Sequence, residues 1–91
     1  MPLIILESVF EKPISEEEFD ALADRVTPCL EERHARWVTS YMALDRKRRI
    51  CVFEAVDAEA VHEAYRMSGV KFERAWTAEQ IVDDEEDAEN E

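Results

Sequence analysis

Four residues in this sequence have side chains that bind transition metals and fall in or beside predicted β-strands: Glu7, His34, Cys51 and Glu54. Imidazole and carboxylate together suit first-row divalent metals, and a thiolate adds the soft character that favours nickel or zinc. His34 and Glu54 lie at the outer ends of two strands joined by a turn, so a hairpin would bring them close together. Alternation along a strand puts Cys51 on the face opposite to Glu54. The residue types allow a divalent-metal site at His34 and Glu54, but by themselves they favour the alternative, a strand-end histidine beside a solvated or salt-bridged glutamate.

Glu7 is the other carboxylate within a predicted strand, and we expect that strand to lie beside the strand of Glu54. Two carboxylates buried side by side need a metal, a base or a shared proton, because like charges raise each other's pKa. The alternative, which we prefer, is that Glu7 pairs with an arginine such as Arg36 or Arg74.

A small-molecule site is a second chemical possibility. Trp37 and Tyr41 could line a cavity in which Glu54 or His34 acts as acid or base, although aromatic residues in strands also form cores and dimer interfaces. The sequence has no G-x-S-x-G elbow, glycine-rich phosphate loop, C-x-x-C or H-E-x-x-H motif. No enzyme class follows from these residues, and a Cys51 nucleophile would have only His34 to activate it.

Strand and capping signals organise the first half of the chain. Leu3–Phe10 is apolar and rich in β-branched residues, which predicts a strand buried on both faces. Ser15 and Glu18 form a capping box, so we expect a helix to begin there. The inner face of this helix is predicted to hold Phe19, Leu22, Ala23, Val26 and Leu30. Pro28 predicts a kink in the helix, or a second short helix that starts there.

The second half of the chain predicts a hairpin, with a strand over Arg36–Leu44, a turn over Asp45–Arg48 and a strand over Arg49–Ala55. A helix capped by Asp57 and ended by Gly69 is predicted to follow, and then a strand within Phe72–Val82. We expect the basic run Arg46–Arg49 to be an exposed hairpin tip. The alternative is that it contacts the acidic tail of its own chain or of a partner.

The resulting order, β-α-β-β-α-β, is that of a ferredoxin-like α+β fold. Right-handed crossovers give an antiparallel sheet in the order 4-1-3-2 with both helices on one face. Along the second strand Trp37, Thr39 and Tyr41 share one parity, and the other parity is also largely apolar, so neither face of that strand is plainly polar. We expect a homodimer that covers the free face by packing sheet on sheet.

Composition limits the remaining possibilities. The 91 residues suit one domain over 1–82, and seven of the 23 acidic residues lie in 83–91, which we expect to be a disordered tail. The net charge of −12 argues against binding nucleic acid, which relies on lysine and arginine. The longest apolar run, Leu3–Leu6, is too short to span a membrane. Two cysteines without a secretory signal predict a cytoplasmic protein.

The hairpin region resembles a family of small bacterial proteins described as nickel-binding-protein-like, within the dimeric α/β-barrel superfamily. The resemblance rests on His34-Ala35-Arg36-Trp37, Ser40-Tyr41, Asp45, Cys51-x-Phe53-Glu54-Ala55, the stretch 57–61 and Gly69. It implies a ferredoxin-like protomer, a dimer with a barrel-like interface between two sheets, and nickel binding in at least one relative. Members usually carry a proline soon after the position of Gly69, where this chain has Val70-Lys71.

These observations predict a cytoplasmic homodimer that binds a divalent transition metal, nickel foremost, for sequestration or delivery rather than for turnover. Two alternatives remain open at this point. One is a small dimeric α/β-barrel enzyme that acts on an aromatic or other organic substrate. The other is a structural or regulatory dimer without any ligand.

Overall fold

The computed structural model describes residues 1–82, which form four strands and two helices. In chain order these are β1 (Leu3–Val9), α1 (Glu16–Glu32), β2 (Arg36–Met42), β3 (Arg48–Glu54), α2 (Ala58–Ser68) and β4 (Arg74–Ala78). The predicted order of elements is confirmed. The acidic tail predicted over 83–91 lies outside the described residues.

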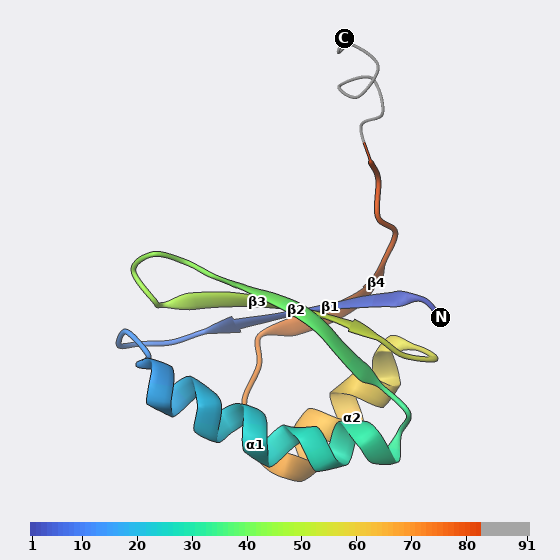
Figure 1. Cartoon of the computed structure of the whole chain (residues 1–91), viewed down its shortest axis with the longest axis horizontal. Helices are drawn as coiled ribbons and strands as arrows, with labels where there is room; N and C mark the ends of the chain where they lie inside the picture. Colours follow the sequence, from blue (N-terminus) through green and yellow to red (C-terminus); the bar gives the residue numbers. More distant parts are fainter. Residues whose placement is uncertain (83–91) are drawn as a thin grey trace, which may run out of the picture.

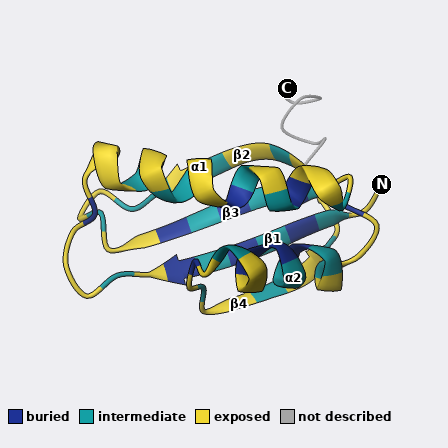
Figure 2. Ribbon diagram, turned by 90° about the horizontal axis from the view of Figure 1, so that it is seen from below, coloured by how far each residue is buried: buried dark blue, intermediate teal, exposed yellow. Residues whose placement is uncertain are grey.

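All four strands form one antiparallel sheet in the order β2-β3-β1-β4. Counted from the other edge, this is the predicted order 4-1-3-2, so the topology is confirmed. Both helices lie on the same side of the sheet (Figure 1). Seen from the helix side, α1 lies in front of β2 and β3, and α2 lies in front of β1 and β4 (Figure 2). Residues 1–82 therefore form two layers, and none of their helices covers the other face of the sheet.

The helix ends follow the signals in the sequence. The hydroxyl of Ser15 accepts a hydrogen bond from the Glu18 N–H at 3.0 Å, and the Glu18 carboxylate accepts one from the Ser15 N–H at 2.9 Å. This is the predicted capping box, which satisfies two backbone donors at the start of α1. The Asp57 carboxylate caps α2 in the same way, and Gly69 ends α2 with a left-handed φ of 75°.

Helix α1 continues through Pro28 as a single helix, so the predicted second short helix does not form. A proline removes one backbone donor and crowds the carbonyl four residues earlier. That earlier residue, Asp24, is exposed, as is Pro28, so solvent can hydrate the carbonyl that loses its partner. One turn of α1 tolerates this loss because the opposite side of the helix is anchored in the core by Val26 and Leu30.

Neither helix has the length and composition of a membrane span. Helix α1 has 17 residues and α2 has 11, whereas crossing a bilayer takes about 20 apolar residues. Within residues 1–82, no helix is both long enough and apolar enough to cross a membrane.

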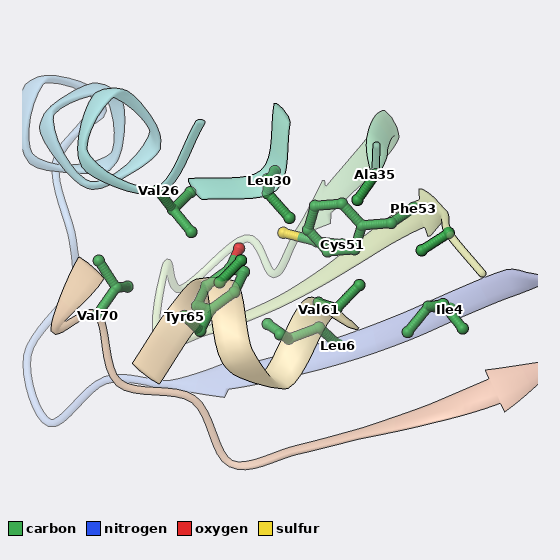
Figure 3. Close-up of a cluster of buried hydrophobic side chains, with 12 residues drawn as sticks. Ile4, Leu6, Val26, Leu30, Ala35, Cys51, Phe53, Val61, Tyr65 and Val70 are labelled. Carbon is green, nitrogen blue, oxygen red and sulfur yellow. The ribbon is translucent and has the colours of Figure 1, made fainter. Parts of the chain in front are cut away.

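The hydrophobic core fills the space between the sheet and the helices (Figure 3). Its central side chains are at most 2% exposed: Ile4, Leu6, Cys51 and Phe53 from the sheet, and Val26, Leu30, Val61, Ala64 and Tyr65 from the helices. Burying each large apolar side chain contributes roughly 1.5–3 kcal/mol. In β1 only alternate residues are buried, so the prediction that this strand is buried on both faces is wrong for a single chain.

Gly69 offers a direct test of the end of α2. Gly69→Ala should lower the free energy of unfolding by about 1–2 kcal/mol, because a Cβ disfavours the left-handed conformation. The added Cβ would also lie 3.0 Å from the Arg25 Nη2 atom. Asparagine tolerates this conformation better, so Gly69→Asn should lose less stability in urea unfolding. Equal losses in the two variants would contradict the conformational explanation.

Candidate functional site

The sheet face opposite the helices carries a continuous apolar band, which we call the open face. All four strands contribute to it, through Leu3, Ile5, Val38, Tyr41, Ile50, Val52, Trp76 and Ala78. Tyr41 is 66% exposed and Trp76 is 41% exposed. The band contains a hollow of about 250 Å³ to which Tyr41, Val52, Glu79 and Gln80 contribute. Contiguous apolar surface of this kind marks an interaction site.

Ion pairs flank the apolar band at both ends. Glu7 lies between two arginines, with its carboxylate oxygens 3.2 Å from Arg48 Nε and 3.1 Å from Arg74 Nε, and its side chain is 13% exposed. Glu54 pairs with Arg36 at 2.7 Å. The preferred prediction that Glu7 pairs with an arginine is therefore confirmed.

Glu7 and Glu54 do not share a site. Glu54 lies opposite Leu3 in the register between β1 and β3, four residues along β1 from Glu7. Four residues of an extended strand span about 13 Å. Glu7 pairs with two arginines and Glu54 with one, so the two carboxylates do not need a common metal or proton.

His34 lies in the connection between α1 and β2, where it adopts a left-handed φ of 57° and is exposed. Strand β2 begins two residues later, so Arg36 and not His34 is opposite Glu54. Cys51 is fully buried on the helix side of the sheet, as strand alternation predicted. Among residues 1–82, no three or more histidine, cysteine, aspartate or glutamate side chains come close enough to hold one metal ion. A single protomer thus does not assemble the four predicted ligands into one site.

A bulge in β2 separates the two aromatic residues predicted to line a ligand cavity. Trp37 lies opposite Phe53, but Thr39 lies opposite Val52, so the register shifts between Trp37 and Thr39. One extra residue in a strand reverses the parity of everything beyond it. Trp37 therefore points toward the helices and packs 5.1 Å from the Phe53 ring, while Tyr41 points out of the open face. The predicted pocket of Trp37, Tyr41 and Glu54 cannot form within one protomer.

Cys51 belongs to a chain of hydrogen-bonded groups that leads from the half-buried Trp37 and Ser40 into the core. The Trp37 indole N–H donates to the Ser40 hydroxyl at 2.8 Å, and that hydroxyl donates to the Cys51 sulfur at 3.2 Å. The Tyr65 hydroxyl points toward the same sulfur (Figure 3). Burial raises the pKa of Cys51, against a smaller opposing effect of the positive charge on Arg49. Burial also raises the pKa of Tyr65. Both groups are neutral at pH 7, so Cys51 lacks the thiolate that a nucleophile or metal ligand requires.

Arg49 does not belong to the exposed basic turn that the sequence predicts over Arg46–Arg49. Its side chain is only 1% exposed and lies among aromatic rings. Its guanidinium carbon is 4.5 Å from the ring centre of Phe19, 5.8 Å from that of Phe10 and 5.9 Å from that of Trp37. Strand alternation could have identified it, because Arg49 shares its parity with the inward-facing Cys51.

Among residues 1–82, no carboxylate forms an ion pair with this buried charge. Within the described chain, the Nε and Nη1 atoms of Arg49 have no hydrogen-bond partner. Burying an unpaired charge costs several kcal/mol, and each contact between a cation and an aromatic face returns roughly 0.5–2 kcal/mol. The three contacts of Arg49 with aromatic rings offset part of the free-energy cost of burying its charge. They do not provide hydrogen-bond acceptors for its N–H groups.

The fold and the open face define the class of protein. It is a small ferredoxin-like α+β sandwich in which helices cover one face of the sheet and apolar residues occupy the other. A family model described as "Nickel responsive protein SCO4226-like" matches residues 4–77, and the chain belongs to this family. The resemblance seen in the residues is confirmed.

A similar solved structure supports the same fold. It is described as the crystal structure of SCO4226 from Streptomyces coelicolor A3(2), with a TM-score of 0.78 over 88% of this chain and 99% of that chain. The two sequences are only 11% identical, so this likeness shows the fold alone. No significant match was found among curated proteins.

The raised pKa of Cys51 predicts a loss of stability at alkaline pH. The unfolded chain releases the thiol proton near the ordinary pKa of 9.0, whereas the folded chain keeps it. The stabilisation is therefore complete below pH 9 and is lost as the pH rises toward the folded pKa. We expect the free energy of unfolding to fall by up to about 1.4 kcal/mol per pH unit above pH 9 from this group.

Urea unfolding at pH 8 to 10.5 measures this slope. Cys51→Ala should have a shallower slope, whatever its stability at pH 7, whereas Cys29→Ala should keep the slope of the parent chain. Identical slopes for the parent chain and Cys51→Ala would show that Cys51 does not cause the alkaline loss.

Proposed function

We propose that this chain acts as a cytoplasmic, nickel-responsive homodimer that binds nickel, or another divalent transition metal, for sequestration or delivery. The observation that carries the proposal is the open face, because it supplies the dimer contact within a family described by its response to nickel. Both cysteines are free, which is consistent with a reducing compartment.

The arrangement of the open face supports a sheet-on-sheet dimer. Stable interfaces combine an apolar centre with a polar rim, and here the aromatic side chains of Tyr41 and Trp76 lie in a band flanked by the ion pairs of Glu7 and Glu54. A two-fold axis would place the same band on both partners. A chain of this size also gains relatively more from association than a large domain, because it buries less of its own surface.

His34 is the favoured metal ligand of the two histidines. Its side chain is exposed where the chain leaves α1, whereas His62 packs 5.3 Å from the Phe72 ring and has a buried Nε2 atom. We propose Glu54 as the second ligand, released from Arg36. The ion pair between Arg36 and Glu54 is largely exposed and therefore weak, so a metal ion can displace it.

The remaining coordination positions are filled by water or by the partner protomer in this proposal. Glu7 is a poorer candidate because two arginines hold it, and Cys51 is a poorer one because it is buried and neutral.

The dimer is tested by analytical ultracentrifugation of the full chain without a tag. The parent chain should sediment as a dimer at micromolar concentration. Tyr41→Glu places a charge in the apolar band and should weaken dimerisation at least about tenfold. Leu44→Glu is a matched control, because Leu44 is fully exposed in the turn between β2 and β3 and outside the band. A monomeric parent chain, or equal effects of the two variants, would contradict the proposed interface.

Nickel binding is tested by titration calorimetry on protein purified without a histidine tag. We expect His34→Ala to lose about tenfold or more in affinity, while His62→Ala binds like the parent chain. Glu54→Gln should weaken binding, and Arg36→Gln should strengthen it because Glu54 becomes free. Equal affinities of the parent chain and His34→Ala, or no binding by either, would remove His34 from this role.

A further inference from the structure

We propose that Arg49 is the anion-binding group of a second site, between α1 and the sheet, that binds a small molecule with one carboxylate and an apolar body. This site lies on the helix side of the sheet, opposite the open face. It requires neither a metal nor a dimer, so it stands apart from the proposed function.

The polar end of the site consists of two side chains on neighbouring strands, Ser8 and Arg49. Ser8 in β1 lies directly opposite Arg49 in β3, and both residues are 1% exposed. Within residues 1–82, the Ser8 hydroxyl, like the Nε and Nη1 atoms of Arg49, has no hydrogen-bond partner. A carboxylate can accept two hydrogen bonds from a guanidinium and another from a hydroxyl. One carboxylate would therefore satisfy all three atoms, which native interiors seldom leave unpaired.

The apolar end of the site is a groove beside these residues. Two hollows, of about 400 Å³ and 610 Å³, meet there, and Phe10 and Leu22 line both of them. Ile14 extends the first hollow, and Val70 extends the second. Together they run from the connection between β1 and α1 to the connection between α2 and β4, and they offer an apolar surface to a short hydrocarbon chain or a ring.

Phe10 contacts both the groove and Arg49. It lines the two hollows, and the centre of its ring lies 5.8 Å from the Arg49 guanidinium carbon. Neither hollow is lined by Arg49 or Ser8, and Phe10 is half-buried directly after the last residue of β1. The proposal therefore requires the Phe10 side chain to rotate, so that the ligand reaches Arg49 from the groove.

The charges around the groove select the class of ligand. Lys12 lines one hollow and Lys71 the other, so each hollow has one lysine in its lining. Glu11 and Glu18 also lie on the rim, and the chain carries a net charge of −12. Phosphorylated and other multiply charged ligands are disfavoured by these acids. A monocarboxylate fits both the single buried arginine and the apolar groove.

Hexanoate and hexanamide are matched probes, because they share an apolar body and differ in charge. Titration of the full-length, metal-free protein, followed by two-dimensional NMR, should show saturable binding of hexanoate with shifts at Phe10 and Leu22. Hexanamide should bind at least about tenfold more weakly. No saturable binding of hexanoate, or equal binding of the two probes, would overturn the proposal.

Substitutions then test the polar end. Arg49→Met should weaken hexanoate binding about 10- to 100-fold, and Ser8→Ala should weaken it less. Arg66→Met removes the same charge from the exposed face of α2 and should bind hexanoate like the parent chain. Unchanged binding by Arg49→Met, or an equal loss in Arg66→Met, would show that Arg49 does not recognise the carboxylate.

Thermal unfolding separates a binding role from a purely structural one. Without ligand, Arg49→Met should melt at or above the temperature of the parent chain, because a buried unpaired charge is removed. Hexanoate should raise the melting temperature of the parent chain only. If Arg49→Met does not fold, Arg49→Lys keeps the charge without the planar fork and should bind hexanoate more weakly. A less stable Arg49→Met, together with a parent chain that hexanoate does not stabilise, would assign Arg49 a structural role and overturn the proposal.

Discussion

The unequal covering of the sheet is the constraint on which the rest of the structure depends. Side chains along a strand alternate between two faces, and both helices pack against the same face. Ile4, Leu6 and Phe53 are buried there, while their neighbours Ile5 and Val52 remain half-exposed on the other face. The apolar character of the open face follows directly, because four strands rich in β-branched and aromatic residues have only one helical layer to cover them. The proposed dimer is the consequence of that shortage.

The covered side of the sheet carries more polar chemistry than a hydrophobic core needs. Arg49 and Ser8 both place polar atoms in the interior without a hydrogen-bond partner among residues 1–82. Unpaired polar atoms in a low-dielectric interior destabilise the fold, so their presence calls for a compensating role. Aromatic rings offset part of the cost for Arg49. A bound carboxylate would accept hydrogen bonds from the guanidinium and so offset the rest of this cost.

Much of the fold can be predicted from short sequence motifs. The capping box at Ser15, the cap at Asp57 and the left-handed Gly69 each act within a few residues, and each forms as predicted. The site was harder to predict. Metal-ligand residue types were identified, but their convergence depends on distances between elements, and the left-handed turn at His34 puts Arg36 opposite Glu54.

The sequence alone determined the order of elements, their ends and the sheet topology, because hydrophobic periodicity, caps and crossover handedness are properties of short segments and of chain connectivity. Only the tertiary structure decided which faces the side chains occupy beyond the bulge at Trp37, since one extra residue reverses the parity of the strand. It also decided that Arg49 is buried rather than part of the exposed basic turn. Strand alternation places Arg49 on the same face as Cys51, but how deeply its charge is buried depends on which rings and helices pack over it.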